Sequence, residues 1–228
     1  GVGRMGTGDL TDALGIKLVQ VVGVCDVDSK RVEIAQKRVD SFYAERQPGG
    51  QYKGCDAYGD FRELLARGDI DAVQISTPDH WHMIPAIEAA KAGKDIFQQK
   101  PLSLTIREGR FISDTVRRYG RIFQIGSQQR SDGRFRQACE LVRNGRIGKL
   151  HTIKVGFGTD PGCEVKSEMP VPANLNYDMW LGPAPWAPYT EDRVHPQNSL
   201  TARPGWLRIS DYGAGMITGW GSHHLDIA

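Results

Sequence analysis

The chain opens with Gly1-Val2-Gly3-Arg4-Met5-Gly6, and this glycine-rich stretch decides how the rest of the sequence is interpreted. Its spacing is G-x-G-x-x-G, the pattern of the turn between a strand and a helix in dinucleotide-binding folds. The first glycine permits a tight turn, the second lets the backbone approach a pyrophosphate, and the third lets the helix pack closely on the strand. Alone the motif is weak evidence, so the segments that follow decide its meaning.

The residues after the turn supply much of the expected context. We predict a helix that begins after Gly6 and ends at Gly15, where a glycine is well placed to stop it. Val19–Val24 is a short β-branched run typical of a buried parallel strand, and it leads to Asp26, twenty residues beyond Gly6. A carboxylate there can accept hydrogen bonds from the adenosine ribose hydroxyls and would repel a 2′-phosphate, which favours NAD over NADP.

Two alternatives stay open around this acid. Residues 29–31, Ser-Lys-Arg, are able to contact a 2′-phosphate, so NADP remains an alternative cofactor. Alternatively, Asp26 or Asp28 does no more than cap the helix predicted over Ser29–Val39.

Strands and helices alternate through the first half of the chain. The strands are predicted at 72–76, 94–98 and 122–125, and the helices at 61–66, 83–92 and 104–119. Short strands separated by helices of roughly 10–15 residues predict a doubly wound parallel sheet. In such sheets ligands bind beyond the carboxyl ends of the strands, so Thr77–His82, Gln99–Pro101 and Ser127–Arg130 become the candidate site segments.

The sequence changes character after about Gly126. We predict a helix over Arg134–Asn144 and a strand over His151–Phe157, followed by a segment from Asp160 to Pro204 that is rich in Pro, Trp and Asn. The aromatic content of this segment favours an ordered, packed loop. The residues from Gly213 onward are typical of the start of a helix.

Composition narrows the classes of function. The 228 residues include 29 Lys and Arg against 27 Asp and Glu, and a net charge of +2 gives no electrostatic argument for nucleic acid. No stretch approaches the ~18 consecutive apolar residues of a spanning helix. The four cysteines form no C-x-x-C pair, which disfavours a zinc ribbon or thioredoxin-type site, and no metal site is predicted.

Taken in order, these segments resemble the Gfo/Idh/MocA family of nicotinamide-dependent sugar and polyol oxidoreductases. The matching pieces are the glycine opening, Val24–Asp28, Thr77–His82, Ala92–Asp95, Lys100-Pro101, Gly126–Arg130 and the terminal His-His-Leu-Asp. The resemblance implies an α/β fold, with a Rossmann doubly wound parallel sheet in residues 1–126 and an α/β domain on an open, mostly antiparallel sheet in residues 127–228. A Rossmann sheet without its first, central strand leaves backbone groups unpaired, so we expect a truncated view of a longer product.

The resemblance also assigns catalytic residues. The family's catalytic lysine lies in a Glu-Lys-Pro motif, which here is Gln99-Lys100-Pro101; a lysine of lowered pKa can take the proton of an alcohol. The glutamine removes a negative charge beside Lys100 and is expected to leave its pKa lower. In the family's Asp-x-x-x-His element the histidine is His223, but Gly219 stands where the aspartate is expected. Asp226, three residues after His223, is a candidate to orient it.

The remaining predicted contacts follow the same segments. Lys100 and His223 are the predicted catalytic pair. The predicted cofactor-binding residues are Gly1, Gly3, Arg4, Met5, Gly6, Asp26, Thr77, Pro78, His80, His82, Gln99, Lys100 and Gln128. The predicted substrate contacts are Arg130, Trp180 and His224, and Trp180, Trp186 and Tyr189 are a candidate stacking platform for a sugar ring. Alternatively, Arg130 forms a structural ion pair and the aromatic residues pack the loop against the sheet.

We therefore expect an NAD-dependent, or alternatively NADP-dependent, oxidoreductase that moves hydride between nicotinamide and a carbon of a sugar, polyol or glycoside. One alternative is a glycoside-cleaving relative that keeps NAD bound and oxidises the sugar transiently; another is a non-catalytic nucleotide-binding relative, suggested by Gly219 and Gln99. The expected partners are a small carbohydrate and copies of the same chain in a dimer or tetramer, without nucleic acid or membrane. The expected compartment is the cytoplasm, with export after removal of a leader left open.

Overall fold

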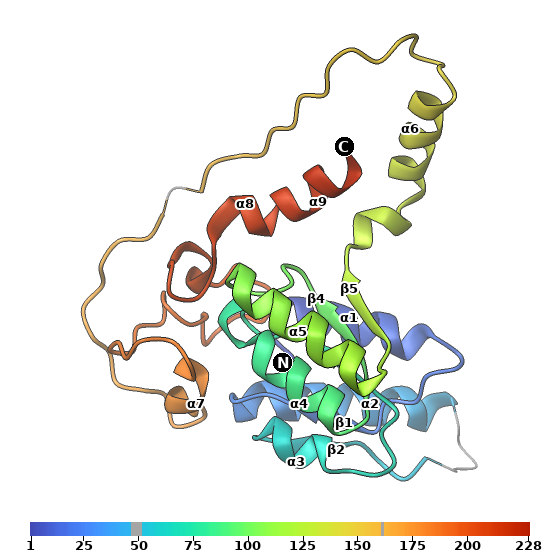
Figure 1. The fold of residues 1–228 in the computed structure, drawn as a ribbon. Helices are drawn as coiled ribbons and strands as arrows, with labels where there is room; N and C mark the ends of the chain where they lie inside the picture. The colour runs from blue at the N-terminus through green and yellow to red at the C-terminus, as the bar shows by residue number, and fades with distance from the viewer. Residues whose placement is uncertain (47–51, 161) are drawn as a thin grey trace.

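Short parallel strands build two sheets in the first half of the chain (Figure 1). The computed structural model describes residues 1–46, 52–160 and 162–228. The strands are β1 (Gly23–Cys25) and β2 (Asp56–Tyr58) in one sheet, and β3 (Ala72–Ile75), β4 (Asp95–Gln99) and β5 (Phe123–Gly126), in that order, in the other. Every pairing between these strands is parallel, so the predicted parallel α/β architecture is confirmed.

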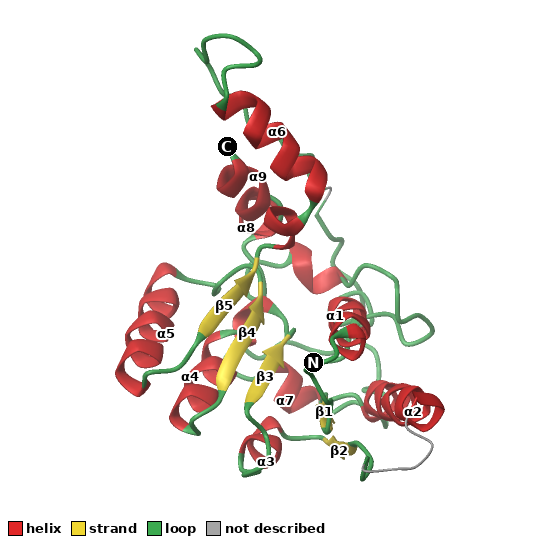
Figure 2. Cartoon of the chain, turned by 90° about the vertical axis from the view of Figure 1, so that its right-hand side faces the viewer, coloured by secondary structure: helices red, strands yellow, loops and turns green. Residues whose placement is uncertain are grey.

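Helices follow most strands and cover the sheets. They are α1 (Arg4–Gly15), α2 (Ser29–Arg46), α3 (Phe61–Leu65), α4 (Met83–Lys91), α5 (Ile106–Tyr119), α6 (Gly133–Arg143), α7 (Tyr177–Leu181), α8 (Gly215–Gly219) and α9 (Gly221–Ile227). Short 3₁₀ turns lie at Asp79–Trp81, Gln128–Ser131 and Gly205–Arg208. Figure 2 shows β3, β4 and β5 side by side, with α4 and α5 near them and α1 and α2 beside β1.

Local sequence signals account for where α5 begins and ends. The side chain of Thr105 accepts a hydrogen bond from the backbone of Glu108, whose carboxylate accepts one from Thr105 in return, which is a capping box. Gly120 then ends the helix with φ of 62°, a left-handed conformation that costs glycine little. The predicted boundaries in this part of the chain are therefore confirmed to within a few residues.

Two predicted strands are wrong in part or entirely. The strand expected at Val19–Val24 is only Gly23–Cys25, because these residues alone pair with β2, which the sequence did not reveal. No strand forms at His151–Phe157, since nothing in the described ranges pairs with that segment and most of its residues are exposed. The helix expected at Ser29–Val39 is α2, which continues to Arg46.

Among the residues that the structure describes, three separate apolar clusters hold the fold together. One joins α1, α2 and β1, and a second lies between the three-stranded sheet and helices α4 and α5. The third contains Tyr177, Trp180, Leu181, Val194 and Tyr212 from the later part of the chain. This third cluster confirms that much of the Pro- and Trp-rich segment is packed, as its aromatic content predicted. Within the described residues, no helix is both long and apolar enough to cross a bilayer.

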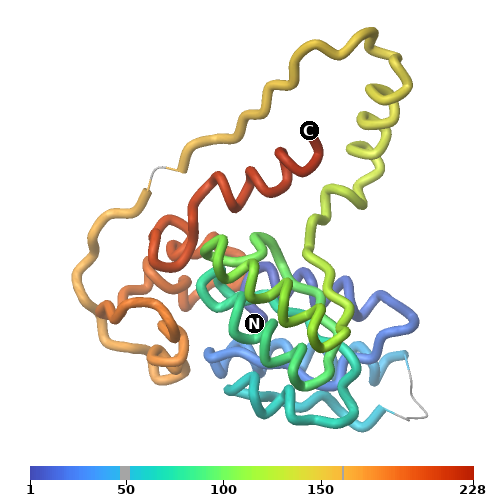
Figure 3. Tube along the Cα trace, in the orientation of Figure 1, coloured from blue at the N-terminus to red at the C-terminus, as the bar shows by residue number. Residues whose placement is uncertain are grey.

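The chain leaves the first half at α6 and later comes back to it. Its trace arches away as an extended segment and returns to lie against the residues after β1 (Figure 3). There the backbone N–H of Ser29 donates to the carbonyl of Asn174 at 2.9 Å, and that of Asn176 donates to the carbonyl of Val27 at 2.9 Å. Backbone pairing therefore fixes the returning segment to the start of α2.

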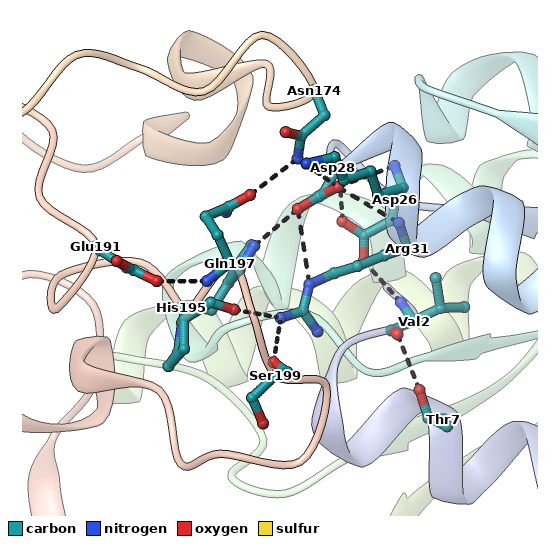
Figure 4. Close-up of polar contacts among 12 residues, drawn as sticks. Val2, Thr7, Asp26, Asp28, Arg31, Asn174, Glu191, His195, Gln197 and Ser199 are labelled. Atoms are coloured by element: carbon teal, nitrogen blue, oxygen red, sulfur yellow. Dashed lines mark hydrogen bonds and ion pairs between the residues drawn. The ribbon is translucent and has the colours of Figure 1, made fainter.

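Asp28 is the polar centre of this junction (Figure 4). The residue is 2% exposed, and its carboxylate accepts hydrogen bonds from His195 Nε2 and Asn174 Nδ2, both at 2.9 Å. Arg31 Nε lies 3.7 Å from the same carboxylate, while Arg31 Nη2 donates to the carbonyls of Pro196 and Ser199. Burial opposes ionisation of Asp28, but the bonds from His195 and Asn174 outweigh it and hold the pKa of Asp28 below its usual value.

The Gly6 contact can be tested against a matched position on the same helix. A Cβ at Gly6 would lie 2.1 Å from the carbonyl oxygen of Gly1, whereas a Cβ at Gly8 would meet nothing within 4 Å. We expect Gly6→Ala to lower the free energy of unfolding by about 1–3 kcal/mol, because backbone must move. Gly8→Ala should instead raise it by up to about 1 kcal/mol through helix propensity. Urea titrations of both variants check this; equal effects would contradict it.

A second test concerns the junction at Asp28. Asp28→Asn should lower the free energy of unfolding at pH 7 by about 1.5–3 kcal/mol, because buried donors lose a charged acceptor. The folded-state pKa of Asp28 is lowered, so its stabilisation is present above about pH 4 and is lost as the pH falls through the folded value. The difference between variant and wild type should therefore shrink in acid. Urea titrations from pH 7 downward measure it, with Asp114→Asn, at an exposed pair, as the control.

Candidate functional site

The glycine turn lies where α1 begins, directly against the end of β3. A Cβ at Gly1 would be 2.9 Å from the carbonyl oxygen of Ser76, and Gly6 packs on the carbonyl of Gly1. The first turn of α1 carries no acidic side chain, and Gly3 at its N-cap makes no side-chain bond. The N–H groups at this end of the helix are thus available to an anion, and the helix dipole favours one.

A cavity of about 800 Å³ opens beside this turn. Its walls include the turn itself, residues that follow the carboxyl ends of the strands, and residues from the later part of the chain. They include Gly1, Gly3, Arg4, Met5, Gly6, Asp26, Arg31, Thr77, Pro78, Asp79, Gln99, Lys100, Gln128, Trp180, His195, Arg203, Gly219 and His223. Val24 of β1 and Ile75 of β3 also line the cavity. Most of the predicted cofactor residues therefore share one space.

Asp26 and Asp28 have different tasks. The Asp26 carboxylate accepts hydrogen bonds from the backbone N–H of Val2 at 2.8 Å and from that of Asp28 at 3.0 Å. These bonds hold the acid at the edge of the glycine turn while it lines the cavity. Asp28 is the residue that caps α2, accepting from the N–H of Lys30 at 3.0 Å. Of the two acids that were candidates to cap this helix, Asp28 is therefore the one that does so.

Lys100 follows β4 and is half-buried in the cavity wall. Burial lowers its pKa; the carboxylate of Asp79 acts in the opposite direction, and Arg203 lowers the pKa further. Gln99, its neighbour, points elsewhere: its Nε2 donates to Asp9 of α1 at 2.8 Å. The direction expected for the lysine pKa is therefore found, but burial is its main cause.

His223 reaches the same cavity from α9. It is 3% exposed, and burial together with the charge of Lys100 lowers its pKa, so the neutral ring predominates at pH 7. Its Nδ1 is buried and has no hydrogen-bond partner among the described residues. Asp226, the residue expected to orient it, instead pairs with Arg130, whose Nη2 lies 2.8 Å from Oδ1. Arg130 therefore forms a structural ion pair, which was the alternative to its predicted contact with substrate.

His80 and His82 stand behind the cavity wall. His80 Nε2 bonds the carbonyl of Trp180 at 3.0 Å, and Trp81 Nε1 donates to that same oxygen at 2.9 Å. His82 lies between the carbonyls of Pro101 and Thr77, 2.6 and 2.9 Å from its two ring nitrogens. Burial lowers the pKa of His82 to about 4. Both rings thus join elements that carry cavity residues and do not line the cavity themselves.

The predicted aromatic platform is not assembled. Trp180 lines the cavity and stacks on Tyr177 with ring centroids 6.0 Å apart. Trp186, however, is 76% exposed, and Tyr189 is 2% exposed within the third apolar cluster. His224, another predicted substrate contact, turns its Nδ1 to the carbonyl of Gly156 at 3.0 Å. Of the predicted substrate residues, only Trp180 reaches the cavity.

Sequence reasoning assigned no role to several cavity residues with ionisable side chains, among them Asp79, His195 and Arg203. Asp79 lies in the Thr77–His82 segment, which the rule that ligands bind beyond strand ends had selected, but the residue itself was not among the predicted contacts. His195 and Arg203 lie in the irregular segment, which carries no motif. In the described part of the chain, no group of three or more His, Cys, Asp or Glu side chains is arranged to hold a metal ion.

The cavity fits a dinucleotide by its own chemistry. The free N–H groups of α1 suit a pyrophosphate, and Asp26 suits a ribose diol. The hydroxyl of Thr77 and Nδ1 of His223 are buried without a protein partner among the described residues, and both residues line the cavity. Buried polar atoms of this kind are usually satisfied by something, and a bound ligand would do so.

Comparisons with known proteins agree with this geometry. A family model described as an oxidoreductase family with an NAD-binding Rossmann fold matches residues 1–127, and one for the C-terminal alpha/beta domain of that family matches residues 150–228. An uncharacterized oxidoreductase of Bacillus subtilis is 26% identical over 96% of this chain and 61% of its own length. An alpha-N-acetylgalactosaminidase of Shewanella oneidensis is 32% identical over 66% of this chain and 32% of its own.

A solved structure resembles part of the chain. The scyllo-inositol dehydrogenase of Lactobacillus casei, crystallised with NAD(H) and scyllo-inositol, aligns with a TM-score of 0.56 and 27% identity over 65% of this chain and 40% of that one. The chain spans less than two thirds of the length of each of these three relatives. Because the Rossmann family model covers more than half of the chain and the motifs occur in the family's order, the chain belongs to the Gfo/Idh/MocA oxidoreductase family.

Proposed function

We propose that the protein is an NAD-dependent oxidoreductase that transfers hydride between nicotinamide and a hydroxyl-bearing carbon of a sugar or polyol. The observation that carries the proposal is that a single cavity contains both the glycine turn at the start of α1 and Lys100, whose pKa is lowered. The similarity to an inositol dehydrogenase crystallised with NAD(H) supports the cofactor and the class of substrate.

Residues of the chain would hold the cofactor along the cavity. The N–H groups at the start of α1 would bind the pyrophosphate, Asp26 the adenosine ribose, and Thr77 and Gln128 would lie at the far end. Bound NAD supplies the acceptor for the hydride. Lys100, in its neutral form, accepts the hydroxyl proton of the alcohol, and His223 offers a neutral ring that can hold a substrate hydroxyl.

The adenosine end supports NAD over NADP. Asp26 adds a negative charge where a 2′-phosphate would sit. Arg31, the most obvious cation for such a phosphate, already faces Asp28, and its Nη2 donates to the carbonyls of Pro196 and Ser199. Its guanidinium is therefore committed to the junction. Assembly into a homo-oligomer stays a prediction, which sedimentation can test. A cytoplasmic location also stays a prediction, which cell fractionation can test.

The role of Lys100 can be tested by separating binding from turnover. Lys100→Gln should lower kcat for polyol oxidation by roughly 10²–10⁴-fold, because the reaction loses its base, while NAD still binds. Lys91→Gln, at an exposed ion pair on α4, is the matched control and should leave kcat unchanged. Calorimetric titration with NAD and initial rates of NADH formation measure both. Absence of NAD binding by the wild-type protein, or full activity of Lys100→Gln, would contradict the proposal.

A second candidate follows from the similarity to an alpha-N-acetylgalactosaminidase. Such an activity would cleave a glycoside with transient oxidation of the sugar and no net use of NAD. A polyol dehydrogenase should accumulate NADH in step with oxidised polyol and leave an aryl N-acetylgalactosaminide intact. Release of the aryl alcohol without net NADH, measured with that substrate, would favour the glycosidase instead.

A further inference from the structure

We propose that Asp9 is a positioning residue that holds the ends of β3 and β4 against the helix of the glycine turn, and so sets where Lys100 lies relative to the cofactor. The part that concerns the cofactor rests on the proposed oxidoreductase function. Asp9 lies in α1, and its two carboxylate oxygens accept hydrogen bonds from the ends of two strands. The hydroxyl of Ser76, directly after β3, donates to Oδ2 at 2.6 Å. Nε2 of Gln99, the last residue of β4, donates to Oδ1 at 2.8 Å.

The same serine also lies against the glycine turn. A Cβ at Gly6 would be 3.3 Å from Cβ of Ser76, and a Cβ at Gly1 would be 2.9 Å from the carbonyl oxygen of Ser76. Asp9 follows Gly6 by three residues in α1, so the two lie on the same face of the helix. The start of α1 is therefore fixed to the end of β3 both by close packing at the turn and by the hydrogen bond to Asp9.

Each strand residue that bonds Asp9 is followed by a residue of the cavity wall. Thr77 comes after Ser76 and Lys100 after Gln99, and both line the cavity together with the start of α1. Gln99 is 5% exposed, so its side chain is enclosed as well as hydrogen-bonded. A shift of α1 would therefore be passed on to the backbone that carries Lys100. The two bonds to Asp9 would thus set the position of Lys100 relative to the N–H groups that bind the pyrophosphate.

The chemistry of this contact calls for an amide at position 99. An ionised carboxylate only accepts hydrogen bonds, so a second carboxylate facing Asp9 would leave the pair without a donor. Burial raises the pKa of Asp9, and the bonds from Ser76 and Gln99 lower it; among charged groups, Asp12 raises it and the amino group of Gly1 lowers it. This accounts for the glutamine that stands where the Glu-Lys-Pro motif has glutamate, because the negative charge of the contact lies on Asp9 instead.

Introducing a second carboxylate tests the contact. In Gln99→Glu two carboxylates face each other, so that one must take up a proton or the contact must break. At pH 8 we expect kcat for polyol oxidation to fall by roughly 10–100-fold, because Lys100 is displaced, and the affinity for NAD to fall by a smaller factor. The ratio of wild-type kcat to variant kcat should shrink as the pH falls toward 6, because a shared proton restores a donor. Initial rates and calorimetric titration with NAD measure these values.

The double variant Asp9→Asn/Gln99→Glu exchanges the two groups. The asparagine keeps an oxygen for the hydroxyl of Ser76 and offers its amide to the new carboxylate, so most of the lost kcat at pH 8 should return. Gln99→Glu/Asp12→Asn is the matched control: it removes one negative charge from an exposed position of the same helix and should restore nothing. Wild-type kcat in Gln99→Glu at pH 8, no rescue by Asp9→Asn, or equal rescue by Asp12→Asn would overturn the proposal.

Urea titrations of the same variants without cofactor separate this contact from the proposed function. The pKa of the carboxylate pair in Gln99→Glu is raised in the folded state, so its destabilising effect is present above that pKa and is lost as the pH falls through it. If Gln99→Glu does not fold at pH 8, the double variant should fold, and failure of both would contradict the exchange. Stability restored without kcat would refute the positioning role. Absence of NAD binding and of polyol oxidation in the wild type would instead refute the proposed function, while the unfolding data still decide whether the contact exists.

Discussion

The close approach of Gly6 to the carbonyl of Gly1 is the constraint on which the site depends. It allows α1 to begin directly beyond the end of β3, so that the unbonded N–H groups of the helix face the cavity. If α1 began farther from this edge, its N–H groups and its dipole would point away from the cavity, and the proposed pyrophosphate site would lose both. The bond from the N–H of Val2 to Asp26 then ties the end of β1 to the same turn.

Burial is the second organising effect, and it acts on charge. Lys100, Asp79 and His223 come from three different elements, and low water access shifts the pKa of each toward its neutral form. The carboxyl of Asp79 and the amine of Lys100 are therefore held in their neutral forms more readily than they would be in water, a kind of shift that is common at functional sites. In the proposed reaction, the fold would thus act through solvent exclusion as well as through the placement of side chains.

Sequence reasoning predicted the parallel fold and selected the glycine turn and Lys100 as residues of one site. These predictions depend on local spacing and on the rule that sites lie at strand ends. It failed where pairing over long separations decides the outcome. β2 is three residues long, and its pairing with β1 leaves no local periodicity to detect. Asp28, His195 and Asn174 meet across more than 140 residues of chain, and no motif announces that contact. Arg130 and Asp226 likewise pair with each other, whereas the sequence analysis had Arg130 as a substrate contact and Asp226 as the residue that orients His223.

One carbonyl oxygen, that of Trp180, receives donors from both His80 and Trp81, while Trp180 itself walls the cavity. Gly182, two residues later, is so close to the Trp81 ring that a Cβ there would lie 2.1 Å from it. The wall that would sense the shape of a substrate is therefore rigidly coupled to the turn that carries Asp79. A substitution that enlarges the cavity at α7 would therefore also move this turn, so the shape of the cavity and the geometry of the strand-end segment cannot be varied independently.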